Sequence, residues 1–117
     1  RIWKEQRFES AVPFDASGRY TGHSYRVALH LAGTLDTVMG WVEDFGDVKA
    51  HFKPIYEQLD HHPLDRLDGI QATDCAGISQ WILTQARPLL PNLCRVDLYA
   101  GDDTGVRDAR PTGAPSV

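Results

Sequence analysis

The sequence predicts a small α+β domain in which an antiparallel sheet carries two helices on one face. Three observations lead to this prediction: alternating apolar residues at 25–31, a change to helical spacing after residue 44, and renewed alternation at 95–99. Strands followed by helices and then by strands are typical of a layered α+β fold. The chain of 117 residues is long enough for one domain with its own core.

The first two strands are expected at residues 2–12 and 25–31. The second gives the clearer signal, because its apolar residues recur at every other position: Tyr25, Val27, Leu29 and Leu31. His30 has the opposite parity and is expected to point away from the core. Residues 39–42 are expected to form a short extended piece, with Asp44 poised to cap the helix that follows.

Two helices are predicted in the second half of the chain. The first begins at Phe45 and has apolar residues at helical spacing: Val48, Phe52, Ile55 and Leu59. Pro54 is expected to kink or split it. The second starts with Thr73 as N-cap and ends before Pro88. Its expected buried stripe consists of four residues: Ile78, Trp81, Ile82 and Ala86.

The C-terminal part predicts the rest of the sheet. A strand is expected at 95–99, an acidic turn at 101–105 and a ragged closing strand after it. We expect a single domain over residues 1–109 and a flexible tail over 110–117, which is rich in Pro, Gly and Ser. A four-stranded sheet covered on one face leaves its edges open. Several such sheets closed into a shared barrel would protect those edges and place an active site between subunits.

Composition excludes several functional classes. The net charge is -4 and no basic cluster occurs, so the electrostatic basis of nucleic-acid binding is missing. No apolar run approaches the roughly 18 residues that cross a bilayer, and the first residues lack the apolar segment of a signal peptide. Two isolated cysteines, Cys75 and Cys94, fit a reducing environment, so we expect a cytoplasmic protein.

Candidate site residues fall into three clusters. Residues 18–25 form an expected loop that delivers His23 and Tyr25 to the start of a strand. Residues 59–65 hold Asp60 beside His61, a natural acid–base unit that exchanges protons near neutral pH. Because neighbouring residues on a helix diverge, Asp60 and His61 are expected to address different partners. The third cluster is the acidic turn at 101–105.

Each cluster also has a purely structural interpretation. Histidines at a helix C-terminus are favoured by the helix dipole, which would explain His61 without chemistry. A lone His23 entering a strand is more often structural than a metal ligand, since catalytic zinc usually has three protein ligands. Ser17 supplies a hydroxyl donor or is simply part of a turn. The acidic turn lacks the ligand spacing of a calcium loop and is interpreted as a hairpin connection.

Four short motifs occur in a characteristic order: Phe8-Glu9-Ser10-Ala11, Gly22-His23-Ser24-Tyr25, Gly40-Trp41-Val42-Glu43-Asp44-Phe45 and Leu59-Asp60-His61-His62. Together they resemble the 6-pyruvoyltetrahydropterin synthase family, above all its bacterial 6-carboxytetrahydropterin synthase branch. The resemblance spans residues 7–105. It implies the tunnelling (T-) fold, in which a four-stranded antiparallel sheet bears two helices on one face. Trimers or hexamers of such subunits form a barrel, with sites between subunits.

The resemblance also implies lost functional groups. The family's three zinc-binding histidines correspond here to Val12, Thr21 and His23. The catalytic cysteine corresponds to Ser17, and the glutamate that anchors the pterin corresponds to Ala100. One imidazole cannot hold a catalytic zinc ion, so no metal and no cofactor are expected.

The family's Asp-His pair is retained as Asp60 and His61. We therefore expect a repurposed, zinc-independent enzyme in which His61, Asp60 and Ser17 are catalytic. The expected reaction is a Pictet–Spengler-type or related ring closure, or a lyase or isomerase reaction, on a small aromatic or heterocyclic substrate. The alternative is a catalytically silent subunit that binds a pterin or another heterocycle or regulates a partner. Expected substrate contacts come from the two strands near the site: His23, Tyr25 and Ala100.

Overall fold

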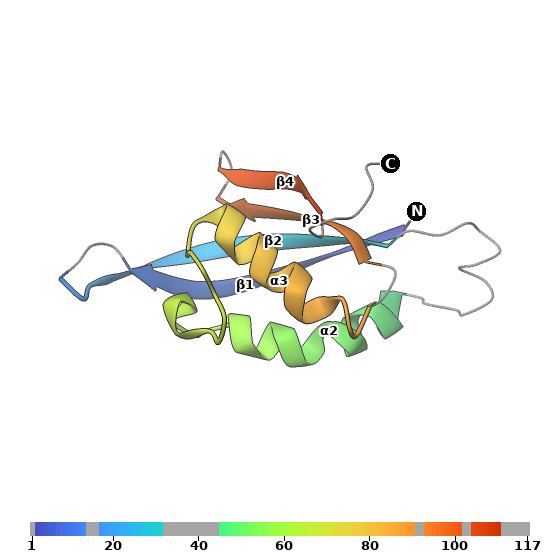
Figure 1. Ribbon diagram of the computed structural model, residues 1–117, viewed down its shortest axis with the longest axis horizontal. Coiled ribbons are helices and arrows are strands. Elements are labelled where there is room, and N and C mark those ends of the chain that lie inside the picture. Colours follow the sequence, from blue (N-terminus) through green and yellow to red (C-terminus); the bar gives the residue numbers. More distant parts are fainter. Residues whose placement is uncertain (1, 14–16, 32–44, 91–92, 102–103, 111–117) are drawn as a thin grey trace.

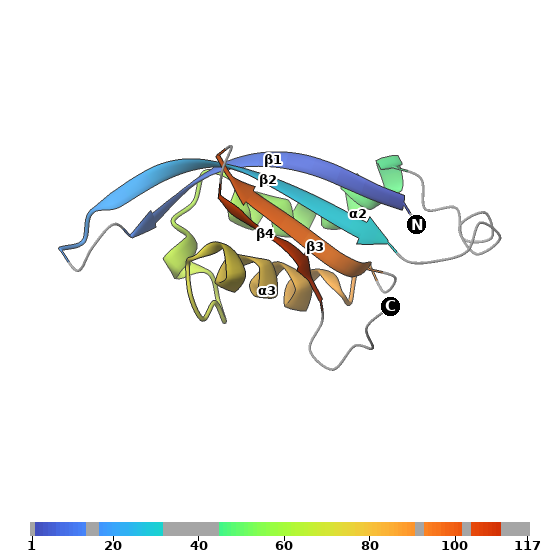
Figure 2. The ribbon, with the colours of Figure 1, turned by 90° about the horizontal axis from the view of Figure 1, so that it is seen from above.

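The computed structural model describes residues 2–13, 17–31, 45–90, 93–101 and 104–110. Helices α2 (Phe45–Leu59) and α3 (Cys75–Ala86) lie on the same face of a single sheet, with the short 3-10 helix η1 (Leu64–Arg66) between them in the chain (Figure 1, Figure 2). The sheet has four antiparallel strands in the order β1-β2-β3-β4: Ile2–Pro13, Tyr20–Leu31, Leu93–Ala100 and Gly105–Ala109. The predicted α+β architecture is confirmed.

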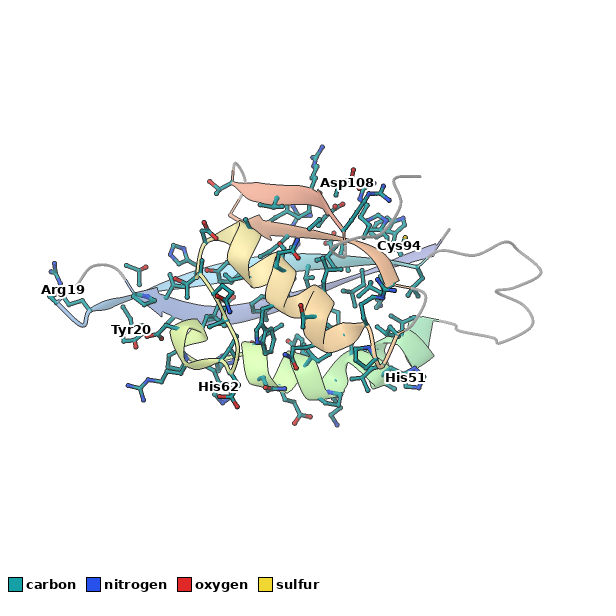
Figure 3. All side chains as sticks on the ribbon, in the orientation of Figure 1. Arg19, Tyr20, His51, His62, Cys94 and Asp108 are labelled. Atoms are coloured by element: carbon teal, nitrogen blue, oxygen red, sulfur yellow. The ribbon has the colours of Figure 1, made fainter. Side chains whose placement is uncertain are left out.

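Strands β1 and β2 form a long hairpin. They pair from Ile2 opposite Leu31 to Pro13 opposite Tyr20, so β2 begins five residues before the expected position 25. The prediction of a loop over residues 18–25 was wrong for 20–25, because residues 20–24 find partners at 9–13 on β1. The far end of the hairpin extends beyond the helices, and Tyr20 lies there (Figure 1, Figure 3).

The other two strands complete the sheet at its opposite side. Strand β3 is longer than the predicted 95–99, because residues up to Ala100 pair with β2. The expected closing strand is β4, which pairs with β3 through an irregular register. Strands β1 and β4 are therefore the two edges of the sheet. No helix in the part of the chain described by the structure is long and apolar enough to cross a membrane.

The core lies between the sheet and the two helices. All the apolar residues that periodicity assigned to it on β2, α2 and α3 are buried there, from Tyr25 to Ala86. Each large apolar side chain removed from water contributes about 1.5–3 kcal/mol. The indole of Trp81 is satisfied as well, because its Nε1 donates to the carbonyl of Asp68 at 2.8 Å. Thus the predicted periodicity identified the core face of each element.

Helix α2 passes through Pro54 without being split, so of the two predicted outcomes, a kink or a split, the split does not occur. A proline has no N–H to donate to the preceding turn. Phe52 and Ile55 on either side are nonetheless fully packed in the core, and this packing holds the helix together. Downstream, Nε2 of Gln58 donates to the Pro54 carbonyl at 3.3 Å.

The predicted N-cap of helix α3, Thr73, was wrong. Asp74 caps the helix instead. The Asp74 Oδ1 atom accepts a hydrogen bond from the N–H of Gly77 at 2.7 Å, which satisfies one of the free donors of the first turn. The shift by one residue follows from reach: only the side chain at 74 stands three residues before that N–H. The helix ends at Ala86, ahead of Pro88 as predicted.

Other expectations lie outside the described residues. These are the extended piece at 39–42, the cap at Asp44 and, apart from Arg110, the tail at 110–117.

Replacing Gly77 by alanine is expected to destabilise the protein, although alanine is favoured in helices. A Cβ atom at this position would overlap the carbonyl of Ala72, and overpacking of this kind costs about 1–3 kcal/mol. Urea unfolding would measure the difference against Thr84→Ala, a change at an exposed position of the same helix. A higher unfolding midpoint for Gly77→Ala would contradict this packing.

Candidate functional site

The segment that follows α2 runs along the outer edge of β1. The His61 N–H donates to the carbonyl of Glu9 at 2.5 Å, and the Ala11 N–H donates to the carbonyl of His62 at 3.4 Å. These bonds occupy backbone groups that an edge strand would otherwise leave exposed. The position of the segment is thus fixed by the strand as well as by the helix that precedes it.

The Asp60 carboxylate joins this strand to the His61 ring. Its Oδ1 atom accepts from the Glu9 N–H at 2.9 Å, and its Oδ2 atom lies 2.8 Å from Nδ1 of His61. The expectation that Asp60 and His61 address different partners was therefore wrong. Helix α2 ends at Leu59, and His61 has a φ of 58°, so the two residues do not diverge as they would on a helix.

The electrostatics of this pair favour an ionised aspartate. Partial burial alone would raise the pKa of the Asp60 carboxyl, but the Glu9 N–H, the His61 ring and the charge of His62 together hold that pKa below its ordinary 3.8. An ionised Oδ2 accepts a hydrogen bond from the Nδ1–H group, so neutral His61 carries its proton on Nδ1. Its Nε2 then has the lone pair that can accept a proton from a bound molecule.

A hollow of about 390 Å³ opens beside the pair. The His61 side chain is 75% exposed, so a molecule in this hollow can reach it. On the hairpin, the Glu9 carboxylate accepts hydrogen bonds from the Ser24 hydroxyl at 2.7 and 2.9 Å. The residues around the hollow with polar side chains come from β1, β2 and the end of α2: Glu9, Ser10, His23, Ser24, His61 and His62.

Among the predicted site residues, His23 lines the same hollow as His61. Its Nε2 atom lies 3.0 Å from the Thr21 hydroxyl, and its ring is 5.9 Å from that of Tyr25. Tyr25 itself is buried, with its ring stacked on Phe8 at 5.0 Å. Burial, and to a smaller extent the charge of Cys75, raise the pKa of Tyr25 to about 12, so its phenol stays protonated.

Ser17 and Ala100 do not line this hollow. Ser17 is exposed in the turn of the hairpin, where its hydroxyl accepts from Nε of Arg19 at 3.1 Å. Figure 3 shows Arg19 at the far end of the hairpin and His62 close to the end of α2. Ala100 ends β3 opposite Tyr25, and its N–H donates to the Thr104 carbonyl at 2.7 Å. One subunit therefore brings together Asp60, His61 and His23, but not Ser17 or Ala100.

Three residues of the site were not singled out from the sequence: Glu9, Ser24 and His62. Ser24 lines the hollow and donates to the Glu9 carboxylate. Glu9 supplies the N–H and the carbonyl that hold Asp60 and His61. No side-chain pattern signals a role of the backbone, so only the register of strand and segment reveals it. His62 contributes its charge and lines the hollow, and its position next to His61 was the available signal.

The family resemblance implies a zinc site at Val12, Thr21 and His23, and the structure allows its fit to be tested. Val12 and Thr21 are direct partners across the hairpin, so the three residues do lie together. Val12 offers no donor atom, however, and the Thr21 hydroxyl is engaged with Nε2 of His23. In the described ranges, no three His, Cys, Asp or Glu side chains are grouped as metal ligands. These residues do not fit a catalytic zinc ion.

Comparison with known proteins agrees with the geometry of the fold. Residues 1–109 match the model of the family described as 6-pyruvoyl tetrahydropterin synthase. The structure is similar to that of the 6-pyruvoyl tetrahydropterin synthase of Caenorhabditis elegans, with a TM-score of 0.76 and 14% sequence identity. The match covers 92% of this chain and 94% of that chain. The likeness confirms the T-fold of the subunit.

Replacing His61 by alanine is expected to raise the pKa of Asp60, because the change removes a hydrogen bond and a positive charge. In the unchanged protein, Asp60 contributes stability above its unfolded pKa, and this is lost as the pH falls through the lowered folded value. Carbon-13 NMR titration of the Asp60 carboxyl would measure the pKa. His51→Ala, at an exposed position of α2, is the control. An Asp60 pKa at or above 3.8 in the unchanged protein would contradict the described contacts.

Proposed function

Since this chain belongs to the 6-pyruvoyl tetrahydropterin synthase family, we propose that it is a zinc-independent enzyme that works by general acid–base catalysis. The observation that carries the proposal is the 2.8 Å contact between Asp60 Oδ2 and His61 Nδ1 beside an open hollow. A positioned histidine contributes roughly 10²–10⁴-fold to the rate of a reaction through proton transfer. That contribution is useful for a substrate that is already reactive.

Each group has a distinct role in this proposal. His61 takes the proton through Nε2, and the Asp60 carboxylate orients the ring and stabilises its charged form. The backbone of Glu9 positions both residues. His23 and Ser24 line the hollow and offer the substrate an imidazole and a hydroxyl oxygen, the Ser24 proton being donated to Glu9. Tyr25 packs behind His23 and supports its ring.

The proposed reaction is a ring closure of the Pictet–Spengler type on a small aromatic amine. The amine and an aldehyde condense to an iminium ion with loss of water, and an aromatic carbon attacks the iminium carbon to form the C–C bond. His61 then removes the proton from that aromatic carbon, and the electron pair restores the ring. This sequence needs one base and a pocket. Lyase and isomerase reactions that move a single proton use the same groups.

A catalytically silent subunit is the second candidate. The observation in its favour is the replacement of ligand atoms at Val12 and Thr21, which leaves the fold without the family's metal chemistry. Such a subunit would bind a pterin or another heterocycle, or regulate a partner. The ordered contact between Asp60 and His61 favours the enzyme, since binding alone does not require it.

We also propose that the chain forms a homotrimer or hexamer with its sites between subunits. Strands β1 and β4 are the edges of the sheet, and residues 60–62 cover only the part of β1 around Glu9 and Ala11. The far end of the hairpin extends beyond the helices (Figure 1). An assembly formed through the strand edges and the end of the hairpin would bury these exposed parts of the subunit. Ser17 at the hairpin turn would then reach the Asp60–His61 pair of a neighbouring subunit and act as the third catalytic group.

The variant His61→Ala is expected to lower kcat at least about 100-fold, because the base is lost. The assay would incubate arylethylamines with aldehydes and detect cyclised products by mass spectrometry, and light scattering would check the assembly. His51→Ala, which removes a histidine at an exposed position of α2, should retain activity. Full activity in His61→Ala would refute the assignment of the base. Binding of these amines without turnover by the unchanged protein would favour the silent subunit.

Purified protein is expected to contain far less than one zinc ion per subunit, because only one of the three ligand positions, His23, carries an imidazole. The double variant Val12→His with Thr21→His should gain zinc, since it places three imidazoles on adjacent positions of the hairpin. Inductively coupled plasma mass spectrometry would measure both, with Val12→His alone as control. One zinc ion per subunit of the unchanged protein would contradict zinc independence.

A further inference from the structure

Helices α2 and α3 cover one face of the sheet (Figure 2), and we call the opposite face the open face. The open face carries a second hollow of about 270 Å³. Side chains of all four strands line it, including Trp3, Ala28, Tyr99 and Arg107. Ala28 is only 4% exposed, and its methyl group forms the floor between larger neighbours. In the described residues, this hollow and the one beside His61 share no lining residue.

Two guanidinium groups converge over the ring of Tyr99. The Cζ atom of Arg26 lies 4.5 Å from the ring centroid, and that of Arg107 lies 5.6 Å from it. Arg26 has an ion pair with Glu5 at 3.4 Å. In the part of the chain that the structure describes, Arg107 has no carboxylate within ion-pair distance. An anion placed at this ring is attracted by both arginines and reduces their mutual repulsion.

Trp3 supplies an exposed aromatic surface at the β1 side of the hollow. Its side chain is 53% exposed, which is unusual for an indole, and its ring stacks on that of His30 at 6.0 Å. His30 is held in turn by Asp97, whose buried carboxylate lies 3.2 Å from the His30 ring and accepts two bonds from Arg95 at 2.9 Å. The Trp3 ring is therefore positioned by His30, which in turn is held by the ion pair between Asp97 and Arg95.

We propose that this hollow binds a planar aromatic carboxylate, with its ring on Trp3 and its carboxylate at Arg107 and Arg26. The Glu5 carboxylate on β1 sets the orientation, because it repels the anionic end toward β3 and β4. Asp97 does not oppose binding, since Arg95 already balances its charge. Stacking on an aromatic ring and charge-assisted hydrogen bonds are both favourable. The volume suits an acid of one or two rings. The site is independent of the Asp60–His61 pair.

The test uses the full chain and isothermal titration calorimetry with indole-3-acetate. One molecule is expected to bind per subunit. Indole-3-acetamide has the same ring without the charge, and acetate has the charge without the ring, so each should bind at least about tenfold more weakly. Equal affinity for indole-3-acetate and the amide, or no binding of indole-3-acetate at millimolar concentration, would overturn the proposal.

Two variants locate the binding site. Arg107→Gln is expected to weaken indole-3-acetate about tenfold, and Trp3→Leu to weaken it roughly threefold to tenfold. Arg66→Gln, which removes an exposed arginine from η1, should have no effect. Circular dichroism would confirm that each variant is folded. If Arg107→Gln binds like the unchanged protein, or if His61→Ala abolishes binding, the molecule occupies another place and the proposal fails.

Discussion

The pairing of the chain after α2 with the outer edge of β1 is the contact on which the site depends. An edge strand has free backbone groups, and here Glu9 uses both of its own, one for Asp60 and one for His61. Further toward the N-terminus, the Arg7 carbonyl accepts a hydrogen bond from the Tyr56 hydroxyl at 2.7 Å, so β1 is also bonded to α2 itself. The core packing of Leu59 sets where the helix ends. The geometry of the acid–base pair thus depends on the end of α2 and on the backbone of Glu9 at the edge of β1.

Much of the fold could be predicted from local patterns, and the contacts of the site could not. Period-2 alternation on β2 and helical spacing on α2 each encode one buried face, which is why the core was predicted correctly. The β2 start at Tyr20 and the cap at Asp74 depend on a distant partner or on side-chain reach, which spacing does not contain. The contact between Asp60 and His61 needs a left-handed residue after the helix end. Histidine adopts that conformation more often than most residues but still rarely, so the sequence does not predict it; the bonds to Glu9 hold it here.

The fold separates two kinds of surface. One face of the sheet is occupied by α2 and α3, so its side chains are apolar and serve stability. The edge of β1 and the open face carry polar groups that the core does not need. At Val12 and Thr21 the chain lacks the donor atoms that the family resemblance implies, while Asp60 and His61 remain in contact. The proposal of metal-free chemistry rests on these two observations together.

The direct test of this account is the tautomer of His61. Long-range proton–nitrogen NMR correlation distinguishes the two ring nitrogens of a neutral imidazole. The 2.8 Å contact with an ionised Asp60 predicts that the proton resides on Nδ1, which leaves Nε2 as the base. In Asp60→Asn this preference should weaken. A neutral His61 that carries its proton on Nε2 in the unchanged protein would show that Asp60 does not orient the ring, and the acid–base account would fall.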